Sequence, residues 1–242
     1  MSVSVATDLS IAGHVPLSTV DWPGKLVSTV FLQGCPWACG YCQNTEILDP
    51  KTPGVVHWGD VVKHLDNRRG LLDGVVFTGG EALRQEALGH AIDDVKARGF
   101  LVGVHTAGPY PSRLERFIDR IDWVGLDIKA LVDDYRSVVG YDQGARSWKC
   151  LDIVLESGVD YEIRTTVHPG SPAAVQFPEL LSRLKEKGVT SFALQEARAI
   201  GTSETFQREA QAWDLKEWSK EFAGLAELAT TAGFNSVEIR AA

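Results

Sequence analysis

Three of the chain's four cysteines lie together in the segment GCPWACGYCQN, residues 34–44. Cys35, Cys39 and Cys42 fall within eight positions and are surrounded by glycine and proline, so their thiolates can grip a metal centre from one side. Disulfide pairing would leave one of these cysteines over and would need strained short loops. The segment is therefore interpreted as a metal-binding loop.

Thiolates suit both zinc and iron–sulfur clusters. A structural zinc site usually has four ligands, but residues 43–56 contain no further Cys or His, and His57 lies fifteen residues after Cys42. A cubane cluster on three cysteines leaves one iron without a protein ligand, where a small molecule can bind and be reduced. The spacing favours a cluster with one open iron, and a zinc knuckle is the alternative.

The elements that must position this loop alternate along the chain. Residues 5–24 read as a small hairpin or extended arm. Segments typical of buried strands lie at 26–34, 74–80, 100–108, 123–129, 159–167 and 190–198. Apolar residues at helical spacing separate them, around 58–65, 83–95, 114–118, 148–155 and 177–184, and a long helix at 215–229 precedes a strand-like segment at 236–240. This alternation predicts parallel strands, in either a partial barrel or an open doubly wound sheet.

Both folds bind ligands at the C-terminal ends of their strands. The polar or glycine-rich residues that end each apolar segment are therefore expected to face one pocket. They are Gly34 to Cys42, Thr78 to Glu81, His105 to Gly108, Asp127, Lys129, Arg164, Thr166, Gln195 and Glu196. Cys150 lies on the apolar side of its helix and is interpreted as a core residue.

Composition excludes several classes of function. The chain has 242 residues, 44% of them hydrophobic, and a formal net charge of -8 with no basic stripe, which argues against a nucleic-acid partner. No apolar run approaches the ~20 residues of a membrane span, and the N-terminus lacks the pattern of a signal peptide. Thiols grouped in one loop fit a reducing compartment. We expect a cytoplasmic protein of one domain.

The spacing CxxxCxxC, with Tyr41 just before the last cysteine and on a loop after the first strand, resembles the radical S-adenosylmethionine (SAM) enzymes. TGGE at 78–81, after the second strand, resembles the motif through which that family binds the amino group of SAM. Alone, so short a glycine motif could be a plain strand-to-helix turn.

A closer resemblance covers nearly the whole chain. The segments STVDWPGKLVSTVFLQGCPWACGYCQN, FTGGEAL, HTAGPYP, DWVGLDIKA and YEIRTTV resemble the activating proteins of anaerobic ribonucleoside-triphosphate reductases, a family among the glycyl-radical enzyme activases. The resemblance implies a partial (β/α)6 barrel at 26–198, with an N-terminal arm at 1–25 and a C-terminal helix and strand at 199–242. It also implies a glycyl-radical protein as partner and a one-electron donor such as flavodoxin or ferredoxin.

The same resemblance assigns roles to residues. Cys35, Cys39 and Cys42 would hold a 4Fe-4S cluster whose open iron is chelated by SAM, and one-electron reduction would break SAM into methionine and a 5'-deoxyadenosyl radical. That radical would take a hydrogen from a glycine Cα of the partner. The residues implied in SAM binding are Gly79, Gly80 and Glu81 for the amino group, Asp127, Lys129 and Arg164 for the carboxylate and ribose, Thr106 as a weaker candidate, and Tyr41 against adenine.

Two positions depart from the family pattern. Gln43 stands where a histidine is common, and Ala107 stands where an asparagine is common, which leaves the polar contacts near SAM open. Asp127 and Lys129 lie two apart on one side of a predicted strand, so a buried ion pair is an alternative to a ligand site. The other functions considered are a radical SAM enzyme acting on a small molecule or peptide and a non-catalytic metal-binding protein.

Overall fold

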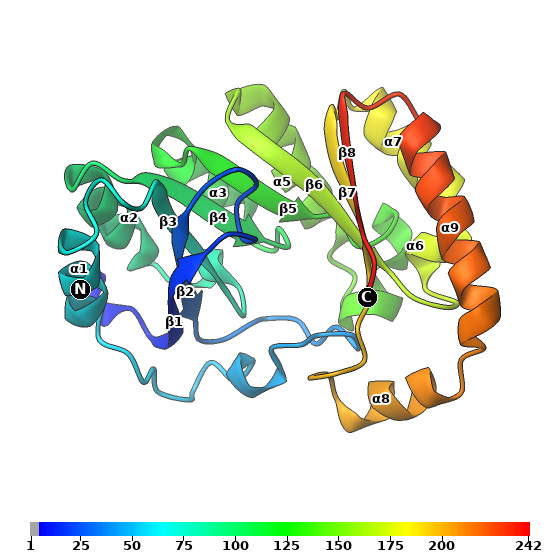
Figure 1. Cartoon of the computed structure of the whole chain (residues 1–242), viewed down its shortest axis with the longest axis horizontal. Helices are drawn as coiled ribbons and strands as arrows, with labels where there is room; N and C mark the ends of the chain where they lie inside the picture. Colours follow the sequence, from blue (N-terminus) through cyan, green and yellow to red (C-terminus); the bar gives the residue numbers. More distant parts are fainter. Residues whose placement is uncertain (1–4) are drawn as a thin grey trace.

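The computed structural model describes residues 5–242 and contains one eight-stranded sheet whose strand order follows the chain. The strands are β1 (Ile11–Ser18), β2 (Val27–Leu32), β3 (Gly74–Gly79), β4 (Leu101–Thr106), β5 (Trp123–Asp127), β6 (Asp160–Val167), β7 (Ser191–Glu196) and β8 (Ser236–Arg240). β1 pairs antiparallel with β2, and all other pairs are parallel. β1 and β8 are the two edges, so the curved sheet is a partial barrel (Figure 1).

The partial barrel confirms the predicted fold class. All six predicted strands are present as β2 to β7, and the segment at 236–240 adds a further parallel strand beside β7. The predicted N-terminal arm forms β1, apart from residues 1–4, which lie outside the described residues.

The helices lie on the outer face of the sheet or connect its strands (Figure 1). They are α1 (Trp58–Asp66), α2 (Leu88–Ala97), α3 (Pro111–Phe117), α4 (Tyr135–Val139), α5 (Gly144–Ser157), α6 (Pro172–Val175), α7 (Phe177–Glu186), α8 (Glu204–Gln211) and α9 (Leu215–Thr231). Short 3-10 turns occur at η1 (Ala6–Asp8), η2 (Thr45–Ile47), η3 (Ala82–Arg84), η4 (Ile118–Arg120) and η5 (Val132–Asp134). Within residues 5–242, the structure has no helix long and apolar enough to cross a membrane.

The helix expected over 83–95 begins later than its apolar spacing indicates. Residues 82–84 form the turn η3, and α2 begins at Leu88. Between them Gln85 is extended, because its side chain bonds both backbone groups of Ser10 (2.8 and 2.9 Å) and the carbonyl of Gln33 (3.0 Å). The helix is therefore interrupted at Gln85, whose side chain links Ser10 in the N-terminal arm to Gln33, which precedes the cysteine loop.

Two hydrophobic cores hold the sheet. The larger one fills the space between the sheet and its helices and contains Phe77, Leu126 and Phe177, all fully buried. The smaller one lies inside the barrel at the N-terminal ends of the strands, where Trp22 from the β1–β2 loop stacks on Trp123 with ring centroids 5.4 Å apart. The two indoles close that end of the barrel, so the open end is the one at which the cysteine loop lies.

Candidate functional site

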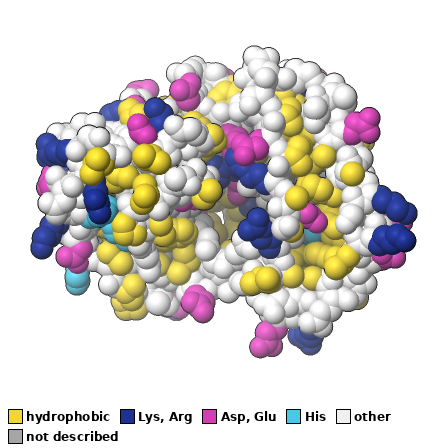
Figure 2. All heavy atoms as spheres, in the orientation of Figure 1, with side chains coloured by type: hydrophobic (Ala, Val, Ile, Leu, Met, Phe, Trp, Pro, Cys, Tyr) yellow, Lys and Arg dark blue, Asp and Glu magenta, His cyan; other side chains and the backbone are white. Residues whose placement is uncertain are grey.

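A cavity of about 870 Å³ occupies the inside of the partial barrel. Its walls are the cysteine loop, the C-terminal ends of β3 to β8 and residues of the β1–β2 loop. Figure 2 shows a hollow at the centre of the molecule where basic and acidic side chains gather. Ligand sites commonly have this size and combine an apolar wall with a few convergent polar groups.

Every residue predicted to bind the cluster or SAM lines this one cavity. They are Cys35, Cys39, Tyr41, Cys42, Gly79, Gly80, Glu81, Thr106, Asp127, Lys129 and Arg164. Thr78, His105, Thr166, Gln195 and Glu196 line it as well, as the strand-end rule predicts. The residues come from six different strand ends or loops, so the barrel is what brings them together.

The cysteine loop is held in place by backbone hydrogen bonds. The N–H groups of Gly34 and Cys35 donate to the carbonyls of Ile47 and Leu48 (2.8 and 2.9 Å), and the N–H of Cys42 donates to Cys39 (3.1 Å). Gly34 has φ +93°, a conformation that glycine adopts without strain. These bonds hold the short turn in a position where all three thiol-bearing residues line the cavity.

The chemistry of the thiols fits an iron–sulfur cluster. Burial raises the pKa of Cys35 to about 12 and also raises that of Cys39, and a bound metal would stabilise the thiolate forms. Among residues 5–242, no three His, Cys, Asp or Glu side chains lie close enough together to hold a single metal ion. In a cubane cluster each thiolate binds a different iron, and three such ligands on one turn suit that arrangement.

The glycine motif lies directly against the cysteine loop. Gly80 N–H donates to Leu32 (2.9 Å) and Glu81 N–H donates to Gly34 (3.0 Å), which continues the β2–β3 pairing past the ends of the strands. A Cβ on Gly80 would lie 2.5 Å from the Gly34 carbonyl oxygen, and one on Gly79, whose φ is +113°, would collide with the backbone of Leu32. Both glycines are therefore required by the close approach of the two segments.

The Glu81 carboxylate is buried and holds the ends of two strands together. It accepts hydrogen bonds from Leu83 N–H (3.1 Å), the Thr106 hydroxyl (2.7 Å) and Ala107 N–H (3.0 Å). Burial raises its pKa to about 7, although these donors oppose the shift. Three of its roughly four acceptor positions are used, so little of the carboxylate is left for a ligand. The Thr106 hydroxyl also accepts from Gly108 N–H (3.0 Å) and so positions Glu81.

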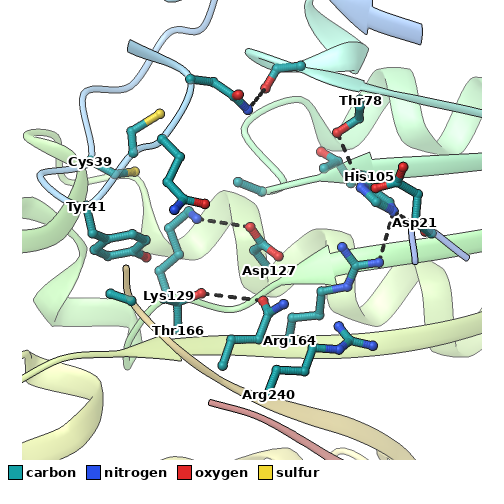
Figure 3. Close-up of a pocket in the computed structure, with 18 of the residues that line it drawn as sticks. Asp21, Cys39, Tyr41, Thr78, His105, Asp127, Lys129, Arg164, Thr166 and Arg240 are labelled. Atoms are coloured by element: carbon teal, nitrogen blue, oxygen red, sulfur yellow. Dashed lines mark hydrogen bonds and ion pairs between the residues drawn. The ribbon is translucent and has the colours of Figure 1, made fainter. Parts of the chain in front are cut away.

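Asp127 and Lys129 form an ion pair in the cavity wall. β5 ends at Asp127, so the expectation that both residues lie on a strand is wrong, yet Lys129 Nζ reaches the Asp127 carboxylate at 3.1 Å (Figure 3). Burial lowers the pKa of Lys129, but the charge of Asp127 outweighs it and the pKa lies well above its usual value. Lys129 is thus a permanently charged cation inside a shielded cavity.

Tyr41 is placed between this cation and a group of aromatic rings. Lys129 Nζ lies 5.4 Å from the centre of the Tyr41 ring. On the other side, His168 and Phe206 meet the ring edge-on, with centroids 5.8 and 6.4 Å away. The Tyr41 hydroxyl is buried without a hydrogen-bond partner in the described part of the chain. Such an orphaned group in a cavity wall suits a bound ligand.

Arg164 belongs to a charged network that sequence reasoning missed. Its Nε bonds the buried Glu162 carboxylate (2.9 Å), which also receives two bonds of 2.9 Å from Arg240 on β8. Its Nη2 lies 3.0 Å from His105 Nε2, and its guanidinium lies over the Trp123 ring. The signal was available, because Glu162 and Arg164 alternate with apolar residues in β6 and so face the inside of the barrel.

Removing the shared carboxylate of this network is expected to destabilise the fold. Glu162→Ala leaves the buried Arg164 guanidinium without a counter-ion and leaves Arg240 with Glu238 alone, which costs about 3–5 kcal/mol in the free energy of unfolding. Urea unfolding measures it. The control is Glu238→Ala, because Glu238 also bonds Arg240 (3.0 Å) but its side chain is 51% exposed, and it should cost less than about 1 kcal/mol. Equal losses in both variants would contradict the assignment.

His105 is expected to make stability fall at acid pH. Burial first, and the Arg164 charge second, hold the pKa of His105 well below its usual 6.5. The folded protein therefore keeps His105 neutral while the unfolded chain takes up a proton below about pH 6.5, so stability present above that pH is lost as the pH falls. We expect His105→Gln to flatten the curve of unfolding free energy between about pH 6.5 and 5 by up to about 1.4 kcal/mol per pH unit.

The comparison at pH 8 separates packing from protonation in this experiment. Both proteins are uncharged at position 105 there, so any difference reports changed contacts with Asp21, Thr78 and Arg164. Parallel pH profiles for the wild type and the variant would show that His105 titrates normally.

Comparison with protein families and relatives gives a consistent result. The model of the Radical SAM superfamily matches residues 29–184. A Methanocaldococcus jannaschii protein that carries the name of a glycyl-radical enzyme activating enzyme is 31% identical over 169 residues, covering 66% of this chain and 68% of that protein. The pyruvate formate-lyase-activating enzyme of Clostridium pasteurianum is 32% identical over 160 residues, covering 63% of this chain and 66% of the enzyme.

Solved structures share the fold. Streptococcus suis SuiB bound to S-adenosylmethionine has a TM-score of 0.64 at 15% identity, covering 87% of this chain and 48% of SuiB. Native anSMEcpe with bound AdoMet and the Cp18Cys peptide has a TM-score of 0.65 at 16% identity, covering 86% of this chain and 60% of that structure. The chain thus spans about half the length of SuiB, and the likeness concerns the fold alone.

Proposed function

The chain belongs to the Radical SAM superfamily, and from that membership we propose that it is an activase that installs a glycyl radical on a partner enzyme. The cofactors of the family are a 4Fe-4S cluster and SAM. The observation that carries the proposal is the similarity to two proteins named as activating enzymes, at 31% identity over 169 residues and 32% identity over 160 residues.

When bound, the cluster would supply one-electron chemistry for the reductive cleavage of SAM, and SAM would supply the means of abstracting a hydrogen atom. We assign the cluster to Cys35, Cys39 and Cys42, because these thiols share one turn at the open end of the barrel. The start of the turn is held by backbone bonds from Gly34 and Cys35 to residues 47 and 48.

Further residues are suited to the two charges of the SAM amino acid group. Lys129 offers a buried cation to the carboxylate, while Asp127 and the carbonyls of Gly79 and Gly80 offer acceptors to the ammonium. Glu81, with most of its acceptor positions already used, is proposed mainly to hold the glycine motif in place and to offer its one remaining position to the ammonium. The proposed role of Thr106 is indirect, through its bond to Glu81. Arg164 lies deeper in the barrel and is proposed to contact the carboxylate or ribose. Tyr41 retains its proposed contact with adenine.

We propose that the partner protein enters the cavity from its open side. Its side opens between the β1–β2 loop, with Thr19 to Gly24, and the end of β8, with Glu238 to Ala241. β1 and β8 are not paired with each other, so no strand within residues 5–242 closes this side. An exposed glycine loop of a partner can reach the inside of the barrel there.

We propose anaerobic ribonucleoside-triphosphate reductase as the partner, on the resemblance of the motif segments between residues 18 and 167. The test mixes the cluster-loaded protein with the host's reductase, SAM and dithionite without oxygen, and records electron paramagnetic resonance spectra. We expect a glycyl radical signal that is absent when the glycine of the reductase is replaced by alanine. SAM cleavage without any radical on the reductase would contradict this partner.

A further inference from the structure

Arginines gather beside the cysteine loop on the outside of the barrel. Arg113 donates to the carbonyls of Leu83 and Arg84 and lies over the Tyr110 ring at 4.9 Å. Arg116 is held by Glu86, which also pairs with Arg113 at 2.8 Å. We define the arginine patch as Arg84, Arg113, Arg116 and Arg146, with Tyr110 between them.

The patch is continuous and keeps excess positive charge. Arg146 reaches the carbonyl of Pro109, next to Tyr110, at 3.5 Å. Glu86 pairs with Arg113 and Arg116, so the four positive charges of the patch exceed the single negative charge of Glu86. Arg116 has a side chain that is 53% exposed. In a chain with a formal net charge of -8, a local group of this sign attracts an acidic partner that the rest of the surface repels.

The patch also lies next to the proposed cluster. A Cβ on Gly34 would lie 2.5 Å from Arg84 Nε, so the guanidinium of Arg84 rests on the residue that precedes Cys35. The surroundings of Tyr110 agree, since its pKa is raised by burial, Glu81 and Cys35 and lowered by Arg113 and Arg84. A protein on the patch is therefore separated from Cys35 by little more than one layer of side chains.

The other side of the cysteine loop is covered. Phe206 of α8 lies 3.6 Å from the position that a Cβ on Gly40 would take, and Gln43 Nε2 bonds the carbonyl of Ile200 (3.3 Å). Trp37 is buried and tied to Gln143 (2.8 Å). The C-terminal segment therefore covers the loop at Gly40 and Gln43 and leaves the side near Cys35 accessible to a partner protein.

We propose that the arginine patch is the docking surface for the one-electron donor, an acidic electron-carrier protein of the flavodoxin or ferredoxin class. The proposal rests on the proposed function, because it needs a cluster at Cys35, Cys39 and Cys42. The carrier loses one electron and the cluster gains it, and no bond is made or broken in this step. Small, charge-steered contacts of this kind are typical of electron-transfer partners.

The test compares two variants with equal changes of net charge. Arg116→Glu/Arg146→Glu reverses the exposed part of the patch and spares Arg84 and Arg113, which bond the backbone. The control, Arg183→Glu/Lys187→Glu, reverses two exposed charges on α7 and at its end. Each cluster-loaded protein is titrated with flavodoxin and with ferredoxin by calorimetry, at about 50 mM and about 300 mM salt. Reduction of the cluster is followed by absorbance, with each carrier and with dithionite.

We expect the patch variant to bind at least one carrier about tenfold more weakly at low salt and to lose most of the salt dependence of binding. Reduction by that carrier should slow in parallel, while reduction by dithionite stays as in the wild type and the control variant behaves as the wild type throughout. Equal weakening in both variants, or unchanged carrier binding in the patch variant, would overturn the proposal.

Loss of reduction by dithionite would indicate that the glutamate variant has a damaged cluster or fold. If the glutamate variant loses reduction by dithionite, Arg116→Gln/Arg146→Gln replaces it, and unchanged carrier binding in that variant overturns the docking surface. Because binding and reduction are measured without a glycyl-radical partner, failure to activate the reductase would affect the proposed function and leave this result standing.

Discussion

Cys39→Ala is expected to remove both the iron–sulfur cluster and SAM cleavage. Cys39 lines the cavity in the middle of the three-thiol turn and lies near Lys129, whose charge lowers its thiol pKa against the effect of burial. With two thiolates left, a cubane would have two irons without protein ligands. After anaerobic reconstitution, we expect iron and sulfide contents near background and no 5'-deoxyadenosine above that of a protein-free reaction.

The matched control is the same substitution at the fourth cysteine. Cys150 is fully buried on α5 and its thiol donates to the Gly108 carbonyl (3.3 Å), outside the cavity. Cys150→Ala should cost about 1–2 kcal/mol in the free energy of unfolding. Its iron content and SAM cleavage should match the wild type. A full cluster in the Cys39 variant, or its loss in the Cys150 variant, would require a different ligand set.

Gly80→Ala is expected to impair SAM cleavage without removing any functional side chain. The added Cβ would lie 2.5 Å from the Gly34 carbonyl oxygen, so the glycine motif and the cysteine loop must move apart. Overpacking of this kind destabilises proteins by about 1–3 kcal/mol. Because misplacement of reacting groups by about 1 Å can reduce a rate 100-fold, we expect a loss of that order in 5'-deoxyadenosine formation under dithionite.

Gly59→Ala is the control for this substitution. Gly59 lies in α1, and a Cβ there meets no atom within 4 Å. Alanine also favours helix over glycine by up to about 1 kcal/mol, so stability should be equal or slightly higher. SAM cleavage should not change. If Gly80→Ala retained wild-type SAM cleavage and stability, the close contact between the two segments would have no functional importance.

The sequence predicted which residues line the cavity where a residue lies at the end of a parallel strand. Thr78, His105 and Asp127 all reach the cavity, because the strands are parallel and end on one side of the sheet. The same rule could not show that Lys129 lies past the end of β5 and still pairs with Asp127, since strand ends are poorly marked by apolar pattern alone.

Contacts between residues far apart in the chain could not be predicted from the sequence. Arg240 bonds Glu162, which is 78 positions earlier, and Gln85 leaves its expected helix to bond Ser10, which is 75 positions earlier. No local pattern encodes such partners, because they depend on which strands become neighbours. α8 went unpredicted for a related reason, since Phe206 is its one buried residue and a helix with so little apolar face has almost no periodic signal.

The covering of the cysteine loop by α8 has a consequence for how the protein is made. Gln43 and its partner Ile200 are 157 positions apart, so the loop leaves the ribosome long before the segment that covers its far side. Domains are synthesised from the N-terminus onward at about 5–20 residues per second. At that rate the 157 residues between Gln43 and Ile200 take about 8–30 s to be made, and during that time the far side of the loop lacks its cover.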